Sequence, residues 1–479
     1  MAHEDRIGGA AGGVAGGSAL WHGRFESGPA ASLWAHTESL SFDVRLWPDD
    51  IRGSLAHVAM LGATGILSSD DVAAVTAALE TVSDEFGRGV FAFEPTDEDI
   101  HTAIERRVTQ LAGDAGARMH TARSRNDQVA AALRLWTKRE MSRVAGLVLD
   151  VVEVFARRAD ESEAQDPPLR LPGYTHLQQA QPVLLSHHLR AHCWALLRDV
   201  DRIFDALHRL DVSPLGAGAL AGTSLPIDPS RTSESLGFAR PFANSLDAVS
   251  DRDFVAESLF ALALLGVHMS RIGEEWVLWT SSEFGFATLD DAYATGSSML
   301  PQKKNADIAE LARGKTGRLV GNLVAMLTVL KGLPLSYNRD LQEDKEPLFD
   351  SVDQVSRALE AIAGMVDTAV FNSAAMSREA DAEALVATDL AEWMVARGVP
   401  FRDAHAVVGN LVRRSLAEGV PLRALVEAAP SLGGEAAQMF EPGAALARRT
   451  SPGAAGPQAA GVQREMLVAA IAEARGRFA

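Results

Sequence analysis

The sequence contains a single cysteine, Cys193, among its 479 residues. One thiol excludes an intramolecular disulfide and any metal site built from several thiolates. Proteins without disulfides are typical of a reducing compartment, so we expect a cytoplasmic location. We expect Cys193 itself to be a small buried hydrophobic residue.

Basic residues are too few to balance the acidic ones. The 45 Lys and Arg residues stand against 63 Asp and Glu residues, which gives a formal net charge of -18 at pH 7. Nucleic acids and anionic membrane surfaces repel a chain of this charge. We therefore expect neither as a partner, whereas a small polar substrate is compatible with this composition.

Long uncharged apolar runs are also missing. Residues 1–18 are rich in Gly and Ala and lack the apolar core of a signal peptide, so we expect a disordered tail. The most apolar segment, residues 259–279, includes Arg271, Glu274 and Glu275. A membrane-spanning helix does not carry such charges without partners, which favours a buried helix of a globular protein.

Proline and glycine are scarce over long stretches, where apolar residues recur at steps of three and four. This period predicts a predominantly helical, all-α chain. Apolar stripes on more than one face predict an elongated bundle, in which these faces are buried either against other subunits or in a thick monomeric core. The five long helices are predicted at residues 129–160, 182–210, 247–280, 305–331 and 345–371.

The length allows two or three domains. A mixed, mostly helical region with turn signals precedes the long helices, and shorter helices with a Gly/Pro/Ala-rich stretch follow them. We predict a tail, an N-terminal helical domain, a central bundle domain and a small C-terminal helical domain. Their predicted bounds are 1–18, 19–125, 126–378 and 379–479.

One polar segment, residues 296–305, reads Gly-Ser-Ser-Met-Leu-Pro-Gln-Lys-Lys-Asn. The hydroxyl of Ser297, the ammonium of Lys303 and the amide of Asn305 lie close together in a flexible stretch, which is typical of a catalytic loop. The alternative is a Ser/Gly turn beside a solvated lysine pair, and it would be the better interpretation of the Ser-Ser or Lys-Lys pair taken alone. The whole ordered run is much harder to obtain by chance.

Residues 121–128 form a second polar segment, directly before a long predicted helix. Arg123 and Arg125 stand where free backbone N–H groups and the helix dipole favour a carboxylate, so this segment is a candidate anion site. Alternatively, Asn126 or Asp127 is simply the N-cap of the helix. Both interpretations hold together, because capping does not use the arginines.

Three further polar segments contain titratable groups. His176 follows a glycine turn and suits proton exchange near neutral pH, although a lone histidine is more often structural. If Asn305 caps the next helix, Glu310 lies in its second turn, and we hypothesise a pair of His176 and Glu310. Asp99 and His101 alone indicate no more than a helix start, and residues 337–346 alone indicate a solvated charge run. His187 and His188 match neither a metal pair nor a triad and receive no role.

Together the polar segments are similar to motifs of the argininosuccinate lyase family, a branch of the aspartase/fumarase superfamily that includes the delta-crystallins. The similarity spans nearly the whole chain. The motif that begins at Gly296 identifies the superfamily, whereas the segments at Ser124 and Leu341 indicate this member. The matching segments are Leu20–Phe25, Ser124–Gln128, Gly173–His176, Ser250–Phe254, Gly296–Asn305 and Tyr337–Glu346.

This resemblance implies a reversible β-elimination that splits argininosuccinate into L-arginine and fumarate, the last step of arginine biosynthesis, without metal or organic cofactor. It also implies a homotetramer with a core of twenty helices, in which each active site gathers motifs from three subunits. Such an assembly fits the separated polar segments and the apolar stripes.

The resemblance also implies residue roles. Ser297 would be the base that removes the carbon-bound proton, activated by loop closure and nearby positive charge. Lys303 and Asn305 would stabilise the negative charge that develops. His176, tuned by Glu310, would be the acid toward the departing guanidino nitrogen. Residues that would hold the substrate are Ser39, Arg125, Asn126, Thr175, Asn305, Tyr337, Gln342 and Lys345, and supporting positions are Asp43, Asp99 and His101.

The sequence departs from the family pattern at a few positions. The pair Met299-Leu300 reverses the usual order with little change of volume, and Ala306 replaces a proline after Asn305. Ile104 and Arg339 also differ, yet no proposed catalytic group is missing. A sister lyase that acts on adenylosuccinate or another N-substituted aspartate is the alternative enzyme. A lyase-like chain retained as a structural protein is the alternative of another class.

Overall fold

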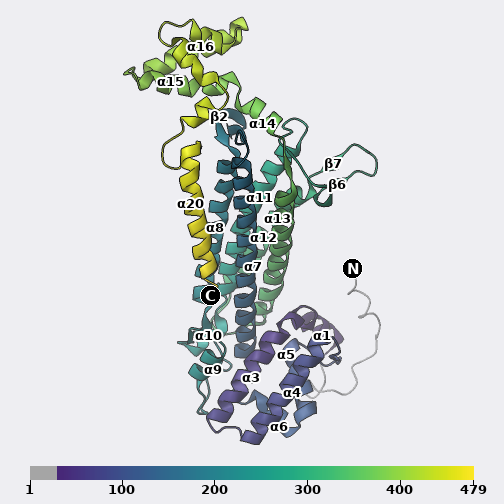
Figure 1. Ribbon diagram of the computed structural model, residues 1–479. Coiled ribbons are helices and arrows are strands. Elements are labelled where there is room, and N and C mark those ends of the chain that lie inside the picture. Colours follow the sequence, from purple (N-terminus) through teal and green to yellow (C-terminus); the bar gives the residue numbers. More distant parts are fainter. Residues whose placement is uncertain (1–29, 479) are drawn as a thin grey trace. The chain divides into compact units, whose positions relative to one another are not determined.

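The computed structural model describes residues 30–478 (Figure 1). The predicted tail and the motif Leu20–Phe25 lie outside the described residues. Helices predominate, as predicted, but the all-α prediction is incomplete, because eight short strands also form. The strands pair as β1–β2, β3–β4, β5–β8 and β6–β7.

The five predicted long helices are present; one begins at Lys345 as predicted, and the other four begin at other residues than predicted. Pro182 lies in a strand, Asn305 lies in another, and Ser245–Ser250 is a separate short helix (α10), so three predicted helices begin too early. The helix predicted from Pro182 begins only at Leu185, because Pro182 and its neighbours pair in a strand instead. The observed helices are α7 (Arg125–Glu163), α8 (Leu185–Leu210), α11 (Asp253–Thr280), α12 (Asp307–Leu330) and α13 (Lys345–Thr368).

By compactness the chain divides into two units, and each gathers separate stretches of sequence. The first unit holds residues up to Met141 together with Asp205–Leu259 and Asn322–Asp350. The second unit holds Ser142–Phe204, Phe260–Gly321 and the residues from Ser351 onward. Because this division does not follow chain order, the domain bounds 19–125, 126–378 and 379–479 stay a prediction.

The first unit is built from short helices around the start of α7. Helix caps fix several of these elements; for example, the Ser68 hydroxyl accepts a hydrogen bond from the Asp71 amide at the start of α4. Its elements are α1 (Ala31–Thr37), α2 (Leu40–Asp43), η2 (Val44–Leu46), α3 (Trp47–Ala63), α4 (Ser69–Gly87), α5 (Ile100–Ala112), α6 (Asp114–Ala117), η3 (Arg118–His120), β3 (Val212–Ser213), α9 (Pro229–Ser235), β4 (Arg240–Pro241), α10 and η5 (Arg339–Asp344).

The second unit contains a helical bundle. Cys193 on α8 is buried, as predicted, and its Sγ lies 3.6 Å from the Val152 carbonyl oxygen on α7. Thr316 on α12 donates to the Gly266 carbonyl of α11 over 2.8 Å. Its other elements are β1 (Arg170–Thr175), β2 (Gln178–Leu184), β5 (Ala287–Thr288), η4 (Asp291–Tyr293), β6 (Thr295–Gly296), β7 (Lys304–Asn305), β8 (Val370–Phe371), α14 (Ser373–Ala380), η6 (Glu383–Val386), α15 (Ala387–Val395), α16 (Phe401–Glu418), α17 (Leu422–Glu427), α18 (Gly433–Ala437), η7 (Gln438–Phe440), α19 (Ala444–Ala447) and α20 (Pro457–Gly476).

Within residues 30–478, α11 is the one helix with the length and hydropathy of a membrane span. Of its most apolar window, 56% is buried inside the chain. Trp276 and Ile272, for example, are almost fully covered. The helix is a core helix of a soluble protein, as the charges in its sequence predict.

Candidate active site

The first unit contains a polar cavity of about 540 Å³. It lies against the starts of α5, α7 and α13, so several helix N-termini face it or its walls. Eight residues that the sequence analysis assigned to substrate binding or support line this one cavity. They are Ser39, Asp43, Asp99, Arg125, Asn126, Tyr337, Gln342 and Lys345.

Arg125 is the first residue of α7, and its guanidinium is fixed by side chains around it. Its Nη1 donates to Gln128 Oε1 over 2.6 Å, and its Nε lies 3.1 Å from the Asp99 carboxylate. The helix is capped by Ser124, whose Oγ accepts from the Asn126 amide, while the Asp127 carboxylate accepts from the Ser124 amide. The cap is thus Ser124 rather than Asn126 or Asp127, and the arginine stays available to an anion.

Asp127 has a second role that sequence did not indicate. Its Oδ2 accepts from the backbone amides of Gly216 and Gly218 over 3.0 and 2.9 Å. Gly218 has φ of +62°, and its hypothetical Cβ would meet the Gly222 carbonyl oxygen at 3.0 Å. Only a residue without a side chain fits there comfortably. The carboxylate thereby ties the start of α7 to this loop, whose Ala219 carbonyl accepts from the Asn126 side chain.

Two acidic residues organise the start of α5 beside the cavity. Asp99 is the N-cap and accepts from the Thr102 amide over 2.6 Å. Burial opposes ionisation of Asp99, but the charges of Arg125 and His101 and the hydrogen bonds from Thr102 together outweigh it, so the pKa of Asp99 lies below its usual value. Asp43 accepts from the Ile100 amide and from the Ser39 hydroxyl, the latter over 2.6 Å. Burial raises the pKa of Asp43.

Residues 337–345 supply a further part of the cavity wall, beside the residues from the starts of α5 and α7. Gln342 and Arg339 donate to the Thr37 carbonyl, which holds η5 against the end of α1. Lys345 is almost fully buried, and its Nζ lies 2.8 Å from Asp344 Oδ1. Burial raises the pKa of Tyr337, so its hydroxyl stays protonated at neutral pH and can donate a hydrogen bond.

Cations and carboxylates both face the cavity. Arg125 and Lys345 suit carboxylates of a ligand, because charge-assisted hydrogen bonds to such groups are strong. Asp43 and Glu98 suit a cationic group such as a guanidinium or an amine. The cavity therefore fits a small molecule that carries both charges.

His101 does not line the cavity, although it was predicted to support the site. It is buried, and its Nδ1 lies 2.8 Å from Asp50 Oδ1, which also accepts from Gln128 Nε2 over 2.7 Å. Gln128 in turn contacts Arg125. Burial disfavours the Asp50 carboxylate, but the charge and hydrogen bond of His101 outweigh it and lower the pKa of Asp50. His101 thus acts through Asp50 and Gln128 on the arginine.

Sequence reasoning missed several cavity residues. Thr102 Oγ1 accepts from Arg125 Nη2 over 3.1 Å, and His120 Nδ1 lies 3.4 Å from Glu105 Oε2. The available signal was periodicity, since Thr102 and Glu105 lie three residues apart and therefore share one face of α5.

The catalytic loop predicted from sequence lies in the second unit and is a hairpin with a short ladder at its base. Thr295 pairs with Asn305 and Gly296 with Lys304 (β6 and β7 in Figure 1). Lys304 Nζ donates to the Leu289 carbonyl over 2.5 Å and binds Asp291. The loop between the strands is therefore held at both ends.

Ser297 is the first residue beyond this ladder. Its side-chain Oγ accepts hydrogen bonds from the backbone amides of Met299 and Leu300 over 3.2 and 3.0 Å. Ser297 is half-buried, whereas Ser298 is exposed. Two N–H donors that face one oxygen are suited to stabilise negative charge on it.

Lys303 and Asn305 lie on the returning side of the loop. Within residues 30–478 the exposed Lys303 Nζ makes no hydrogen bond or ion pair, so its ammonium stays available to a ligand. Asn305 donates to Thr295 Oγ1 and the Gly296 carbonyl over 3.4 Å each. Asn305 belongs to β7 and does not cap α12, which corrects the expectation that placed it there.

His176 lies at the tip of the β1–β2 hairpin, next to the predicted binding residue Thr175. His176 and Leu177 both have φ of +56°, the left-handed conformation that a two-residue hairpin turn requires. Glycine or asparagine usually occupies such positions, because other side chains are strained there. An exposed histidine held in this conformation is a candidate for contact with a ligand.

Glu310 lies in the first turns of α12 and is exposed. Among the described residues no hydrogen bond joins Glu310 to His176, so one chain does not by itself form the pair expected from the sequence. The pairing stays a prediction for residues contributed by different chains.

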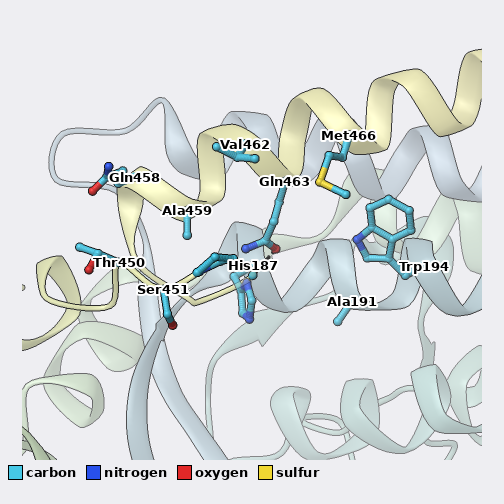
Figure 2. Close-up of a pocket in the computed structure, with 12 residues that line it drawn as sticks. His187, Ala191, Trp194, Thr450, Ser451, Gln458, Ala459, Val462, Gln463 and Met466 are labelled. Atoms are coloured by element: carbon cyan, nitrogen blue, oxygen red, sulfur yellow. Dashed lines mark hydrogen bonds between the residues drawn. The ribbon is translucent and has the colours of Figure 1, made fainter.

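A second cavity, of about 580 Å³, lies in the second unit between α8 and α20 (Figure 2). His187 is the one sequence-noted residue there, and its Nδ1 lies 3.1 Å from Gln463 Oε1. The lining includes Trp194, Val462 and Met466 and no Asp, Glu, Lys or Arg. A cavity without charged groups offers little to an ionic substrate, and we do not assign chemistry to it.

The family models and the similar sequences of known proteins indicate the same family. A model described as "Lyase" matches residues 23–321, and a model of the argininosuccinate lyase C-terminal region matches residues 384–441. An argininosuccinate lyase from Roseiflexus castenholzii is 49% identical over 456 residues, covering 94% of this chain and 98% of the relative. One from Mycobacteroides abscessus is 48% identical over 464 residues, covering 96% and 97%.

Solved structures agree on the fold. An EDDS lyase in complex with formate has a TM-score of 0.80 at 27% identity, covering 92% of this chain and 89% of that one. A variant of EDDS lyase with bound fumarate has a TM-score of 0.79 at 26% identity, with the same coverage. A fumarate lyase from Mesorhizobium has a TM-score of 0.72 at 16% identity, covering 90% and 99%, which supports the fold alone.

Proposed function

The chain belongs to the argininosuccinate lyase family, and we propose that it splits argininosuccinate reversibly into L-arginine and fumarate. The observation that carries this proposal is the mixed-charge cavity of the first unit. Eight predicted residues gather there, with Arg125 and Lys345 for carboxylates and Asp43 beside them for a cationic group. Argininosuccinate carries three carboxylates, a guanidinium and an amine, so it matches both signs of charge.

In the proposed mechanism, deprotonated Ser297 removes the proton from the carbon beside a succinyl carboxylate. The electron pair of that C–H bond forms the carbon–carbon double bond of fumarate as the carbon–nitrogen bond breaks. The hydrogen bonds from the Met299 and Leu300 amides to Ser297 Oγ support this role, because they stabilise the charged oxygen. Lys303 and Asn305 would stabilise the extra negative charge on the substrate carboxylate.

His176 would protonate the departing guanidino nitrogen, which completes the balance of the reaction. Its exposed position at a hairpin tip and its left-handed backbone support contact with a ligand. Thr175, the preceding residue, would hold the substrate beside it. Glu310 would orient the imidazole by a hydrogen bond.

We further propose that the active site is composite and that the protein is a homotetramer with a shared core of twenty helices. The cavity residues belong to the first unit, whereas Ser297, Lys303 and His176 belong to the second. Exposed apolar side chains on α12, such as Leu311, Val324 and Leu327, support burial of this helix against another chain. A reducing, cytoplasmic location stays a prediction from the single cysteine.

The test is to supply purified protein separately with argininosuccinate and with adenylosuccinate and to quantify the fumarate released. We expect release from argininosuccinate and none from adenylosuccinate, because the Asp43 and Glu98 carboxylates in the cavity suit a cationic guanidinium or amine, groups that adenylosuccinate lacks, and they repel its phosphate. Release from adenylosuccinate alone would support the sister lyase. Release from neither substrate would favour the structural-protein alternative.

A further inference from the structure

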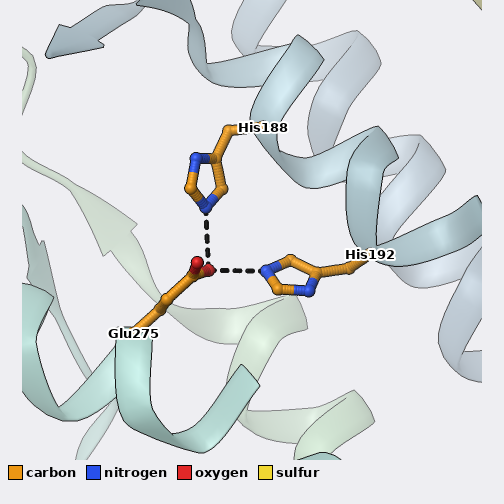
Figure 3. Close-up of side chains that lie close together, drawn as sticks. All are labelled: His188, His192 and Glu275. Carbon is orange, nitrogen blue, oxygen red and sulfur yellow. Dashed lines mark hydrogen bonds and ion pairs between the residues drawn. The ribbon is translucent and has the colours of Figure 1, made fainter. Parts of the chain in front are cut away.

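Two histidines and a glutamate meet at one point in the second unit, outside the proposed catalytic set (Figure 3). His188 Nε2 lies 2.8 Å and His192 Nε2 lies 2.6 Å from the same oxygen, Oε2 of Glu275. The histidines belong to α8 and the glutamate to α11. All three potential ligand atoms lie within 4.8 Å of one another.

The sequence spacing explains this convergence. His188 and His192 are four residues apart, so their side chains lie on the same face of α8, one turn apart. The sequence analysis paired His188 with the adjacent His187 and therefore gave it no role. The relevant partner was His192, at the spacing typical of two metal ligands on a helix.

We propose that His188, His192 and Glu275 form a binding site for a divalent transition-metal ion such as Zn²⁺. Two imidazole nitrogens and one carboxylate oxygen are a known protein ligand set for this ion, which takes three protein ligands and leaves a fourth position open. Mg²⁺ and Ca²⁺ prefer oxygen ligands and are poorly matched.

The ligand atoms need only a small rearrangement to bind an ion. Tetrahedral bonds of about 2.0–2.1 Å place neighbouring ligand atoms about 3.3 Å apart. The two nitrogen-to-oxygen distances of 2.8 and 2.6 Å are about 0.5 and 0.7 Å shorter than this, so the imidazole nitrogens and the carboxylate oxygen would move apart by about half an ångström or slightly more to admit an ion. Each Nε2 that faces the carboxylate carries a proton in the hydrogen bond, so on metal binding this proton is lost to solvent and the neutral imidazole keeps its proton on Nδ1. The hydrogen bonds between imidazole and carboxylate are then replaced by bonds from all three groups to the metal.

The surroundings favour defined ligand positions. The His188 ring lies 5.0 Å from the Trp279 ring, and the His192 ring lies 5.5 Å from the Phe155 ring, measured between centroids. These contacts restrict the imidazole rotamers and reduce the entropy lost on binding an ion.

The site is also accessible. The exposed side-chain fractions are 26% for His188, 14% for His192 and 35% for Glu275, so solvent and an ion can reach the cluster. Within the described chain, neither histidine has a carboxylate partner at its other ring nitrogen, the arrangement that often strengthens metal sites. We therefore expect a reversible site that links α8 to α11, rather than an ion on which folding depends.

The experiment uses tag-free, full-length protein stripped with a chelator and then titrated with ZnCl₂ against a chromophoric competitor. We expect one Zn²⁺ per chain and a higher unfolding temperature in excess Zn²⁺, because binding to the folded state alone stabilises it. CoCl₂ should give the intense visible absorption of four-coordinate Co²⁺. His192→Phe and Glu275→Gln should each weaken binding by about 100-fold or more.

Two controls come from the same helices. His208→Gln, at the exposed end of α8, and Glu274→Gln, which removes the carboxylate that binds Arg313, should leave Zn²⁺ affinity unchanged. If His192→Phe fails to fold, Glu275→Gln, which has nearly the same shape as the native residue, still decides the question. The proposal is overturned if the wild type binds no stoichiometric Zn²⁺, or if both ligand variants bind as the wild type does. The three groups would then be a hydrogen-bonded cluster only.

Discussion

Arg252 and Asp344 form a fully buried ion pair, with 2.5 Å between Nε of the arginine and Oδ2 of the aspartate. The other oxygen of the same carboxylate lies 2.8 Å from Lys345 Nζ. Asp344 therefore joins a buried arginine to a lysine that lines the polar cavity of the first unit. It fixes the position of that lysine without lining the cavity itself.

Replacing Asp344 by Asn should destabilise the protein and weaken substrate binding. Removing one partner leaves Arg252 buried without a counter-charge, which costs about 3–5 kcal/mol of unfolding free energy. Urea unfolding and the KM for argininosuccinate measure the two effects. Asp340→Asn, an exposed change four residues earlier, serves as the control and should alter neither quantity. Normal stability of Asp344→Asn would contradict the importance of the buried pair.

Ser297→Ala should reduce kcat by about 10²–10⁴-fold, the usual contribution of a positioned base, while substrate binding is retained. The base acts on the proton that moves in the transition state and is not a ground-state anchor. Steady-state fumarate release gives kcat, and calorimetric titration of the variant gives the substrate Kd. The neighbouring Ser298→Ala should show a much smaller loss. Equal losses for the two serines would remove the base from Ser297.

A composite site predicts that two inactive variants restore each other. Ser297→Ala alters a second-unit residue and Lys345→Met a first-unit residue, so mixed tetramers contain some sites with neither change. Random mixing of equal amounts should restore up to about a quarter of wild-type activity, if the two residues come from different chains of a symmetric assembly. Fumarate release after co-refolding measures this. Activity no greater than the sum of the separate variants would show that both residues come from the same chain.

His57 should make stability depend on pH below neutrality. Burial and, to a smaller extent, the charge of Arg123 lower the pKa of His57 to about 3, while Nε2 lies 2.9 Å from the Thr121 carbonyl oxygen. The unfolded chain binds a proton near pH 6.5 and the folded chain does not. The contribution of His57 is therefore present above about pH 6.5 and is lost as the pH falls toward about 3, with about 2 kcal/mol lost by pH 5.

His57→Gln should remove this part of the pH dependence, and urea midpoints measured between neutral pH and pH 5 test it. His405→Gln, at an exposed position of α16, is the matched control and should keep the wild-type slope. An unchanged slope in His57→Gln would mean that other groups cause the acid sensitivity.

Gly273 is the close-packing position between α11 and α12. A Cβ at Gly273 would lie 2.3 Å from the Ala309 carbonyl oxygen, so Gly273→Ala must push the helices apart. We expect a loss of about 1–3 kcal/mol, as is usual for overpacking. Gly314→Ala, where nothing lies within 4 Å of the added Cβ, should instead stabilise by about 0.5–1 kcal/mol. Thermal unfolding compares the two variants, and a tolerated Gly273→Ala would contradict the close contact.

Local periodicity predicted most of the fold, because the five long helices have apolar stripes that repeat over many turns. It failed where short-range pairing decides the structure. Pro182 was read as the start of a helix but lies in β2, and Asn305 was read as a cap but pairs with Thr295. The two-residue ladder that includes Asn305 leaves no repeating pattern in the sequence, so periodicity cannot reveal it.

The candidate site likewise contains some residues that the sequence revealed and others that it did not. Arg125 and Ser297 stand out in the sequence as parts of dense polar motifs. Thr102 and His120 contact the same cavity from helix positions without any such motif, and only the packing of the chain brings them to Arg125 and Glu105. His192 was missed because its partner Glu275 lies 83 residues away in the sequence.

The ladder below the catalytic loop has a consequence for substrate affinity. Because Thr295 pairs with Asn305 and Gly296 with Lys304, the two ends of the loop are already together in the free protein. The entropy of joining these ends is lost when the chain folds and not when a substrate arrives. A substrate that closes the loop needs to order only residues 297–303. More of the interaction energy between substrate and protein is then left to stabilise the transition state. The loop can therefore remain flexible in the free protein without weakening the binding of the substrate.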